Sequence, residues 1–238
     1  MSKISRSMLG TAAAGVALAL ATVTAATAAG GTITVPTDFV PQLSDTRATG
    51  HYEVVGTGLH LWTEGNSGTD KVAEYVATST PLSDTGEPSL AYTSTSGGVP
   101  GYQLVVDFDD DGSADGILVG EPASYGTDWW TPGGSKQFVK DGAPSHAGGS
   151  GSDNHGTLDQ WRAAFPDAQV LAFGFSLGSG VKGDGVITSI DFGGTSYTFA
   201  QAVVLESSQQ CKDGGWATST SPDFKNQGDC VSSFSSER

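Results

Sequence analysis

The chain has 238 residues and a formal net charge of −15, from 26 acidic residues against 11 lysines and arginines. This balance argues against nucleic acid or anionic lipid as partners, because binding to phosphate groups depends on lysine and arginine side chains. Only 16% of the residues are charged, 34 are glycine and 9% are aromatic, a composition typical of short strands joined by many turns rather than of helices or disorder.

The N-terminus has the pattern of an export signal. Lys3 and Arg6 precede an apolar run, Met8–Val23, and the small residues Ala26-Thr27-Ala28 form a cleavage site of the A-x-A type. We therefore expect residues 1–28 to be removed and the remaining chain to be secreted, with a net charge of −17 because those residues carry two cations and no acid. No later segment approaches 18 apolar residues, so no membrane span is expected.

Short strands separated by turn signals are expected through most of the chain. Gly56-Thr57-Gly58 predicts a hairpin, and the loop Tyr125–Ser152 is long and rich in glycine. A single short helix is expected over Gly156–Pro166, where Thr157 and Gln160 form a capping box. The expected strands are Gly31–Val35, His51–Val55, Leu59–Glu64, Lys71–Thr78, Leu90–Thr93, two around an acidic loop within Tyr102–Gly120, Gln169–Leu177, Gly185–Phe192 and Thr195–Phe199.

This pattern predicts an all-β fold, a jelly-roll-like β-sandwich over residues 29–206 with that one short helix. The remaining residues, 207–238, are expected to form a small appendage. Cys211 and Cys230 are the only cysteines, and in an exported protein such a pair indicates one disulfide that closes this appendage.

The acidic loop is the sharpest chemical signal. Carboxylates recur at Asp107, Asp109, Asp111 and Asp115, with a glycine after the third, and alternate carboxylates before a turn can surround a hard cation. We therefore expect a calcium site in which the Ser113 carbonyl is a fifth ligand. The loop is not an EF-hand, because Leu118 stands where the bidentate glutamate would be, and the alternative is a plain acidic turn.

Tyr125, Trp129 and Trp130 form an aromatic cluster. On an exposed loop these rings would make a flat platform on which sugar rings stack. The alternative is that the tryptophan pair covers one end of the core.

Two hydrolase patterns also occur. Gly174–Gly178 matches G-x-S-x-G, but no histidine follows Ser176 and no helix can start there, so a surface serine at a strand turn is expected instead. Glu64 and Glu74 lie on expected strands, and a pair of glutamates across a sheet is what a glycoside hydrolase uses.

The C-terminal segment carries a family resemblance. Cys211-Lys212-Asp213-Gly214-Gly215-Trp216 followed by Phe224–Val231 resembles a C-terminal signature, C-K-x-G-G-W and F-K-N-Q-G-x-C-V, of secreted actinobacterial proteins of unassigned function. The resemblance covers about 20 residues, implies export and a disulfide-closed tail, and transfers no catalytic residue. The stretch from Gly58 to Thr198 also looks like the body of such proteins.

The acidic loop has a resemblance of its own. Asp107–Asp115 is similar to the D-x-D-x-D-G-x-x-D loops of extracellular calcium repeats, although it occurs here in a single copy. These features favour a secreted, calcium-stabilised binding module for glycan or cell-wall material. A carbohydrate-active hydrolase and a structural envelope protein without catalysis are the alternatives.

Overall fold

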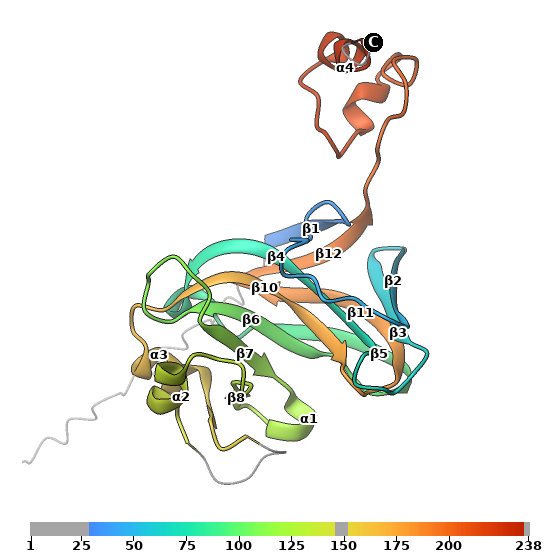
Figure 1. The fold of residues 1–238 in the computed structure, drawn as a ribbon. Coiled ribbons are helices and arrows are strands. Elements are labelled where there is room, and N and C mark those ends of the chain that lie inside the picture. The colour runs from blue at the N-terminus through green and yellow to red at the C-terminus, as the bar shows by residue number, and fades with distance from the viewer. Residues whose placement is uncertain (1–28, 146–151, 236–238) are drawn as a thin grey trace, which may run out of the picture.

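The computed structural model describes residues 29–145 and 152–235, which form two six-stranded β-sheets, several short helices and a C-terminal appendage (Figure 1). The predicted signal peptide, residues 1–28, lies outside the described residues.

The first sheet is centred on β11 (Gly183–Phe192). One edge of β11 pairs with β3 and then with β12, and the other edge pairs with β5 over most of its length. The order is β1-β12-β11-β3-β2, and only β1 and β12 run parallel. The other strands are β1 (Ala29–Val35), β2 (Gly50–Val55), β3 (Gly58–Thr63), β5 (Ser89–Gly97) and β12 (Thr195–Gln201).

The second sheet is antiparallel throughout, in the order β4-β10-β6-β7-β8-β9. Its two longest strands, β4 and β10, pair over most of their length. The strands are β4 (Lys71–Pro81), β6 (Gly101–Asp107), β7 (Gly116–Gly120), β8 (Trp129–Trp130), β9 (His155–Gly156) and β10 (Gln169–Gly178).

A single large core fills the space between the sheets. Successive side chains of a strand point to opposite faces, so alternate apolar residues of both sheets meet there. Fully buried members include Leu59, Leu61, Ile187 and Phe199 from the first sheet and Leu104, Leu118, Phe175 and Leu177 from the second. The two packed sheets agree with the predicted sandwich, while the finer jelly-roll description stays a prediction.

The outer face of the second sheet is covered by a connecting segment, residues 38–47. Its backbone donates hydrogen bonds to β4, from Val40 to Tyr75 and from Asp45 to Ala73, both at 2.9 Å. Leu43 packs on a small buried cluster of that face, Ala73, Tyr75, Val105 and Ala172. The segment thereby closes the edge of β4 as an added strand would.

The expectation of a single short helix is wrong. The helix α3 (Leu158–Ala164) begins at the predicted capping box of Thr157 and Gln160, but the described part of the chain holds three further α-helices. These are α1 (Pro122–Tyr125), α2 (Gln137–Gly142) and α4 (Gln227–Ser233), and there are two 3₁₀ turns, η1 (Leu82–Asp84) and η2 (Gly215–Thr218). Helices of four to seven residues are held by packing rather than by local propensity, so their sequence signal is weak.

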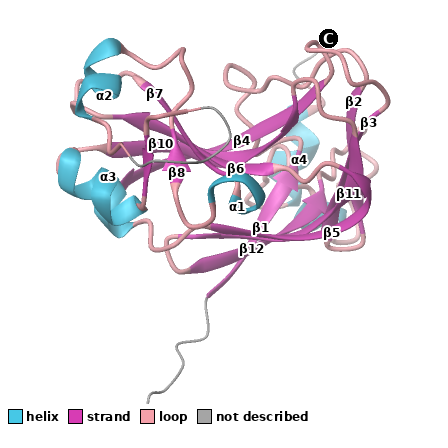
Figure 2. Ribbon diagram, turned by 90° about the horizontal axis from the view of Figure 1, so that it is seen from below, coloured by secondary structure: helices cyan, strands magenta, loops and turns pink. Residues whose placement is uncertain are grey.

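One of these helices, α2, lies in the segment predicted to be a long loop. Val139 of α2 and Trp161 of α3 are both fully buried in the large core. Figures 1 and 2 show α2 and α3 together at one end of the molecule, with β2 and β3 toward the other.

The C-terminal appendage follows β12. A disulfide joins Cys211 to Cys230, as predicted, across 19 positions of sequence. Figure 1 shows this segment standing apart from the two sheets at the end of an extended stretch of chain. Val203, in that stretch, accepts a hydrogen bond from the backbone of Thr220 at 2.9 Å.

Candidate functional site

The acidic loop joins β6 to β7 and gathers the four predicted aspartates. Carboxylate oxygens of Asp107, Asp109, Asp111 and Asp115 all lie within 4.8 Å of one another, an arrangement that could hold a metal ion. Asp107 and Asp115 are buried at the ends of the two strands, whereas Asp109 and Asp111 are exposed.

Hydrogen bonds within the loop hold these carboxylates in place. Asp107 accepts the backbone N–H of Asp111 at 3.2 Å and that of Gly112 at 2.7 Å, and Asp115 accepts that of Phe108 at 2.6 Å. Gly112 has φ of +88°, a left-handed conformation that favours glycine. Ser113 donates its backbone N–H to Asp111 at 2.8 Å.

Lys136 supplies a counter-charge that the sequence pattern did not reveal. Its ammonium is ion-paired with Asp115 and lies 3.8 Å from Asp111. The hydrogen bond to Asp115, with the neighbouring negative charges, raises the pKa of Lys136. Desolvation by the surrounding loop and the charges of Asp115 and Asp111 raise the pKa of Asp109. Among the described residues, one cation therefore faces four carboxylates, and the loop keeps an excess of negative charge.

The aromatic cluster is divided between the two faces of its strand. Trp129 is only 6% exposed and packs edge-to-face on Tyr102 with ring centroids 5.6 Å apart, so it belongs to the core and is not part of an exposed platform. For Trp129 the alternative that the tryptophan pair covers one end of the core therefore applies, and the sequence could not decide between the two because it does not show which way the strand faces.

Trp130 and Tyr125 do lie together. Their rings stack at 5.6 Å with an interplanar angle of 22°, and both are partly buried. The indole N–H of Trp130 donates to Glu121 at 3.1 Å. The carboxylate of Glu121 is therefore held beside the Tyr125–Trp130 pair.

A cleft of about 400 Å³ opens between the edge strand β5 of the first sheet and the β7–α1–β8 region of the second. Its lining is mainly apolar, from Leu90, Tyr92, Val99, Pro100, Tyr102 and Trp129, with carboxylates from Glu87 and Asp128. Sequence reasoning missed this cleft because its walls come from different sheets.

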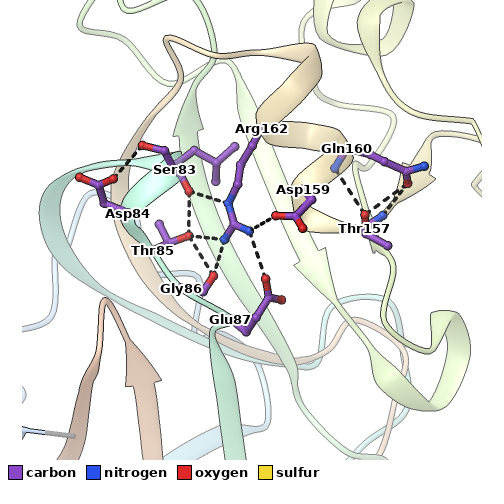
Figure 3. Close-up of polar contacts among 10 residues, drawn as sticks. Ser83, Asp84, Thr85, Gly86, Glu87, Thr157, Asp159, Gln160 and Arg162 are labelled. Atoms are coloured by element: carbon purple, nitrogen blue, oxygen red, sulfur yellow. Dashed lines mark hydrogen bonds and ion pairs between the residues drawn. The ribbon is translucent and has the colours of Figure 1, made fainter. Parts of the chain in front are cut away.

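Arg162 of α3 fixes the turn that leads into β5 (Figure 3). Its guanidinium donates to the Leu82 carbonyl at 3.0 Å, to the Thr85 hydroxyl at 3.2 Å and to the Gly86 carbonyl. It also binds Glu87 at 3.1 Å and Asp159 at 2.7 Å. The fork of donors therefore ties one wall of the cleft to the helix.

The hydrolase candidates do not assemble into a site. Ser176 is buried within β10 instead of lying at a surface turn. Glu74 is 3% exposed, and the hydroxyls of Ser44 and Thr46 donate to its two oxygens. Glu64 is exposed and pairs with His51 at 3.4 Å.

Comparison of the chain with protein-family models, with curated proteins and with solved structures gives no match. Over the part of the chain that the structure describes, no helix has both the length and the apolar character needed to cross a bilayer.

Proposed function

We propose that the protein is a secreted, calcium-stabilised β-sandwich module that binds glycan or cell-wall material. The observation that carries the proposal is the convergence of four aspartate carboxylates within 4.8 Å in the β6–β7 loop. The export signal in the sequence and the disulfide support the extracellular setting, since disulfides persist in oxidising compartments.

Calcium fits the chemistry of the cluster better than a transition metal does. All four side chains offer hard carboxylate oxygens, and neither histidine nor cysteine belongs to the group found among the described residues. The turn at Gly112 and the backbone donors to Asp107 fix the conformation of the loop before a metal ion binds. Calcium tolerates irregular shells of six to eight oxygens, which such a loop can supply together with its carbonyls and water.

Lys136 has a defined part in this proposal. It lies against Asp115 and near Asp111, so its ammonium neutralises part of the cluster in the metal-free protein. A calcium ion bound by both aspartates would compete with that ammonium. Lys136 would then turn toward solvent, where its side chain is already 45% exposed.

A thermal melt of the mature chain in EDTA and in millimolar calcium tests the metal site. A ligand that binds only the native state at 100 times its Kd adds about 2.7 kcal/mol of stability, which gives a clear rise in Tm. Asp109→Ala and Asp111→Ala should each abolish that rise.

Asp110→Asn is the matched control, because Asp110 is an exposed acid of the same loop outside the four-carboxylate group. Lys136→Met should bind calcium more tightly than the wild type. The absence of any calcium-dependent shift in the wild type would reduce the loop to an acidic turn.

The stacked pair Tyr125 and Trp130 is the proposed contact for sugar rings, with Glu121 beside it to accept hydroxyl hydrogen bonds. Screening on a glycan array and on purified cell wall, in calcium, should give binding that Trp130→Ala lowers at least tenfold. Phe138→Ala, which removes an aromatic ring 37% exposed on α2, should leave binding unchanged. If no glycan or wall polymer is retained, the structural envelope protein becomes the better description.

The carbohydrate-active hydrolase is the weaker alternative. Glu74, one of the candidate glutamates for it, is buried and held by hydroxyl groups.

A further inference from the structure

The cleft between the sheets plays no part in the proposed glycan binding. Three aromatic residues line it, Tyr92 from β5, Tyr102 from β6 and Trp129 from β8. The acidic residues Glu87 and Asp128 line it too, and among the described residues its lining contains no lysine, arginine or histidine. An apolar cavity with aromatic walls and acidic groups is complementary to a positively charged organic group.

The rings are held in place by the fold. Trp129 packs against Gly120, where an added Cβ would lie 3.1 Å from the indole, so β7 has a glycine at the point of contact. Tyr102 meets Trp129 edge-to-face, and its hydroxyl donates to the Asp191 carbonyl at 3.2 Å. Both rings are therefore set before any ligand arrives.

Tyr92 forms the opposite wall. Its ring comes from an edge strand, and its buried hydroxyl has no hydrogen-bond partner in the described structure. An added Cβ at Gly185 of β11 would clash with that oxygen, so the Tyr92 hydroxyl lies against β11 and holds the ring in place.

The two carboxylates are fixed at the cleft by contacts outside it. Glu87 is held by Arg162 at 3.1 Å, and Asp128 lies 2.9 Å from a ring nitrogen of His155. Neither Arg162 nor His155 is among the described residues of the lining, whose charged members are both acidic. The net charge of −15 also attracts cations to the protein, over a longer range than these two carboxylates do.

We propose that this cleft binds an organic cation, an ammonium group with apolar substituents. The ammonium lies against the rings of Tyr92, Tyr102 and Trp129, and its apolar body fills the rest of the cleft. About 400 Å³ is more than a bare quaternary ammonium needs, so the ligand also carries an aromatic or branched aliphatic part. This site is separate from the acidic loop and from the Tyr125–Trp130 pair.

Three probes that share a benzyl body but differ in charge test the proposal by isothermal titration. They are benzyltrimethylammonium, benzyl alcohol and phenylacetate. Benzyltrimethylammonium should bind about tenfold more tightly than benzyl alcohol, the gain expected of a desolvated cation–π site. Phenylacetate should bind most weakly. Equal or tighter binding of either of the other two probes would overturn the proposal.

Substitutions in and beside the cleft test whether the probes bind there. Tyr92→Phe keeps the ring and should retain the preference for the cation, whereas Tyr92→Leu should lose most of it. Ala123→Trp places a large side chain in the cleft from an exposed lining position and should abolish binding. Ser124→Trp, on the next exposed residue of α1 and outside the lining, is the matched control and should bind normally.

A general attraction between the acidic protein and any cation is the competing explanation. Asp109→Ala and Asp111→Ala remove charge from the remote loop without touching the cleft. If these variants weaken benzyltrimethylammonium as much as Glu87→Gln does, the binding is not specific and the cleft proposal fails. Because this titration can be run in EDTA, its result is independent of whether the calcium site exists.

Discussion

His60 links three strands on the outer face of the first sheet. Its two ring nitrogens lie 3.2 Å from Glu53 on β2 and 3.0 Å from Asp184 on β11, and its ring stacks on Trp62 at 4.6 Å. A neutral imidazole has only one N–H, so both carboxylates receive a hydrogen bond only when His60 is protonated. Burial by itself lowers the pKa of His60, but the bonds to Asp184 and Glu53 outweigh it and raise the pKa above 6.5.

The stability of the protein should therefore depend on pH through His60. A folded-state pKa above the unfolded value gives stabilisation that is complete below about pH 6.5 and is lost as pH rises through the folded pKa. Melting curves from pH 5.5 to 8.5 should show Tm falling across that window. The fall should be absent in His60→Gln and smaller in Asp184→Asn; the same slope in all three proteins would contradict this account.

The β6–β7 hairpin carries residues of two proposed sites, the acidic cluster and the cleft. Val99, Pro100, Tyr102 and Gly120, at its open end, line the cleft, while Asp107 and Asp115 at its turn belong to the acidic cluster. A strand of this length spans about 20 Å, so the two ligands would not touch. A metal ion bound at the turn would stiffen the hairpin but would not touch a molecule bound in the cleft.

The appendage is a second element whose stability can be tested separately. Its chain is closed by Cys211 and Cys230, and its helix α4 starts at Asn226, whose side chain accepts the Asp229 backbone N–H at 2.9 Å. A loop of this length should gain about 3 kcal/mol from the disulfide on the chain-entropy model. So short a segment has little core of its own and should not stay folded without that bond.

Cys211→Ser with Cys230→Ser should accordingly unfold the appendage and leave the sandwich intact. Limited proteolysis with mass spectrometry should then show rapid cleavage after residue 206, while the main calorimetric transition keeps its Tm. Oxidised wild-type protein is the control and should resist cleavage there. A drop of several degrees in the main transition would mean that the appendage packs on the sandwich in solution.

Over the whole molecule, an acidic shell surrounds a conventional apolar core. Leu59, Leu104 and Phe175 are fully buried between the sheets, whereas carboxylates lie in the acidic loop and beside His60, and acidic residues line the cleft. Such a surface attracts cations of both kinds proposed here, the metal ion and the organic ammonium.

Local patterns in the sequence determined much of this structure. Alternating apolar residues and turn glycines predicted the strands, Thr157 and Gln160 predicted the start of α3, and the spacing of the acids predicted their cluster. These predictions succeeded because each depends on residues close together in the chain, where strand periodicity, capping or loop length alone sets the geometry.

The tertiary structure decided the rest. It buried Trp129 in the core, brought Lys136 onto Asp115, and made a cleft from β5 and β8 that Arg162 of α3 helps to hold. Each of these features depends on how the two sheets and the helices pack against one another. A strand's periodicity shows that one side is buried but not what it is buried against, because that choice depends on contacts between segments far apart in the sequence.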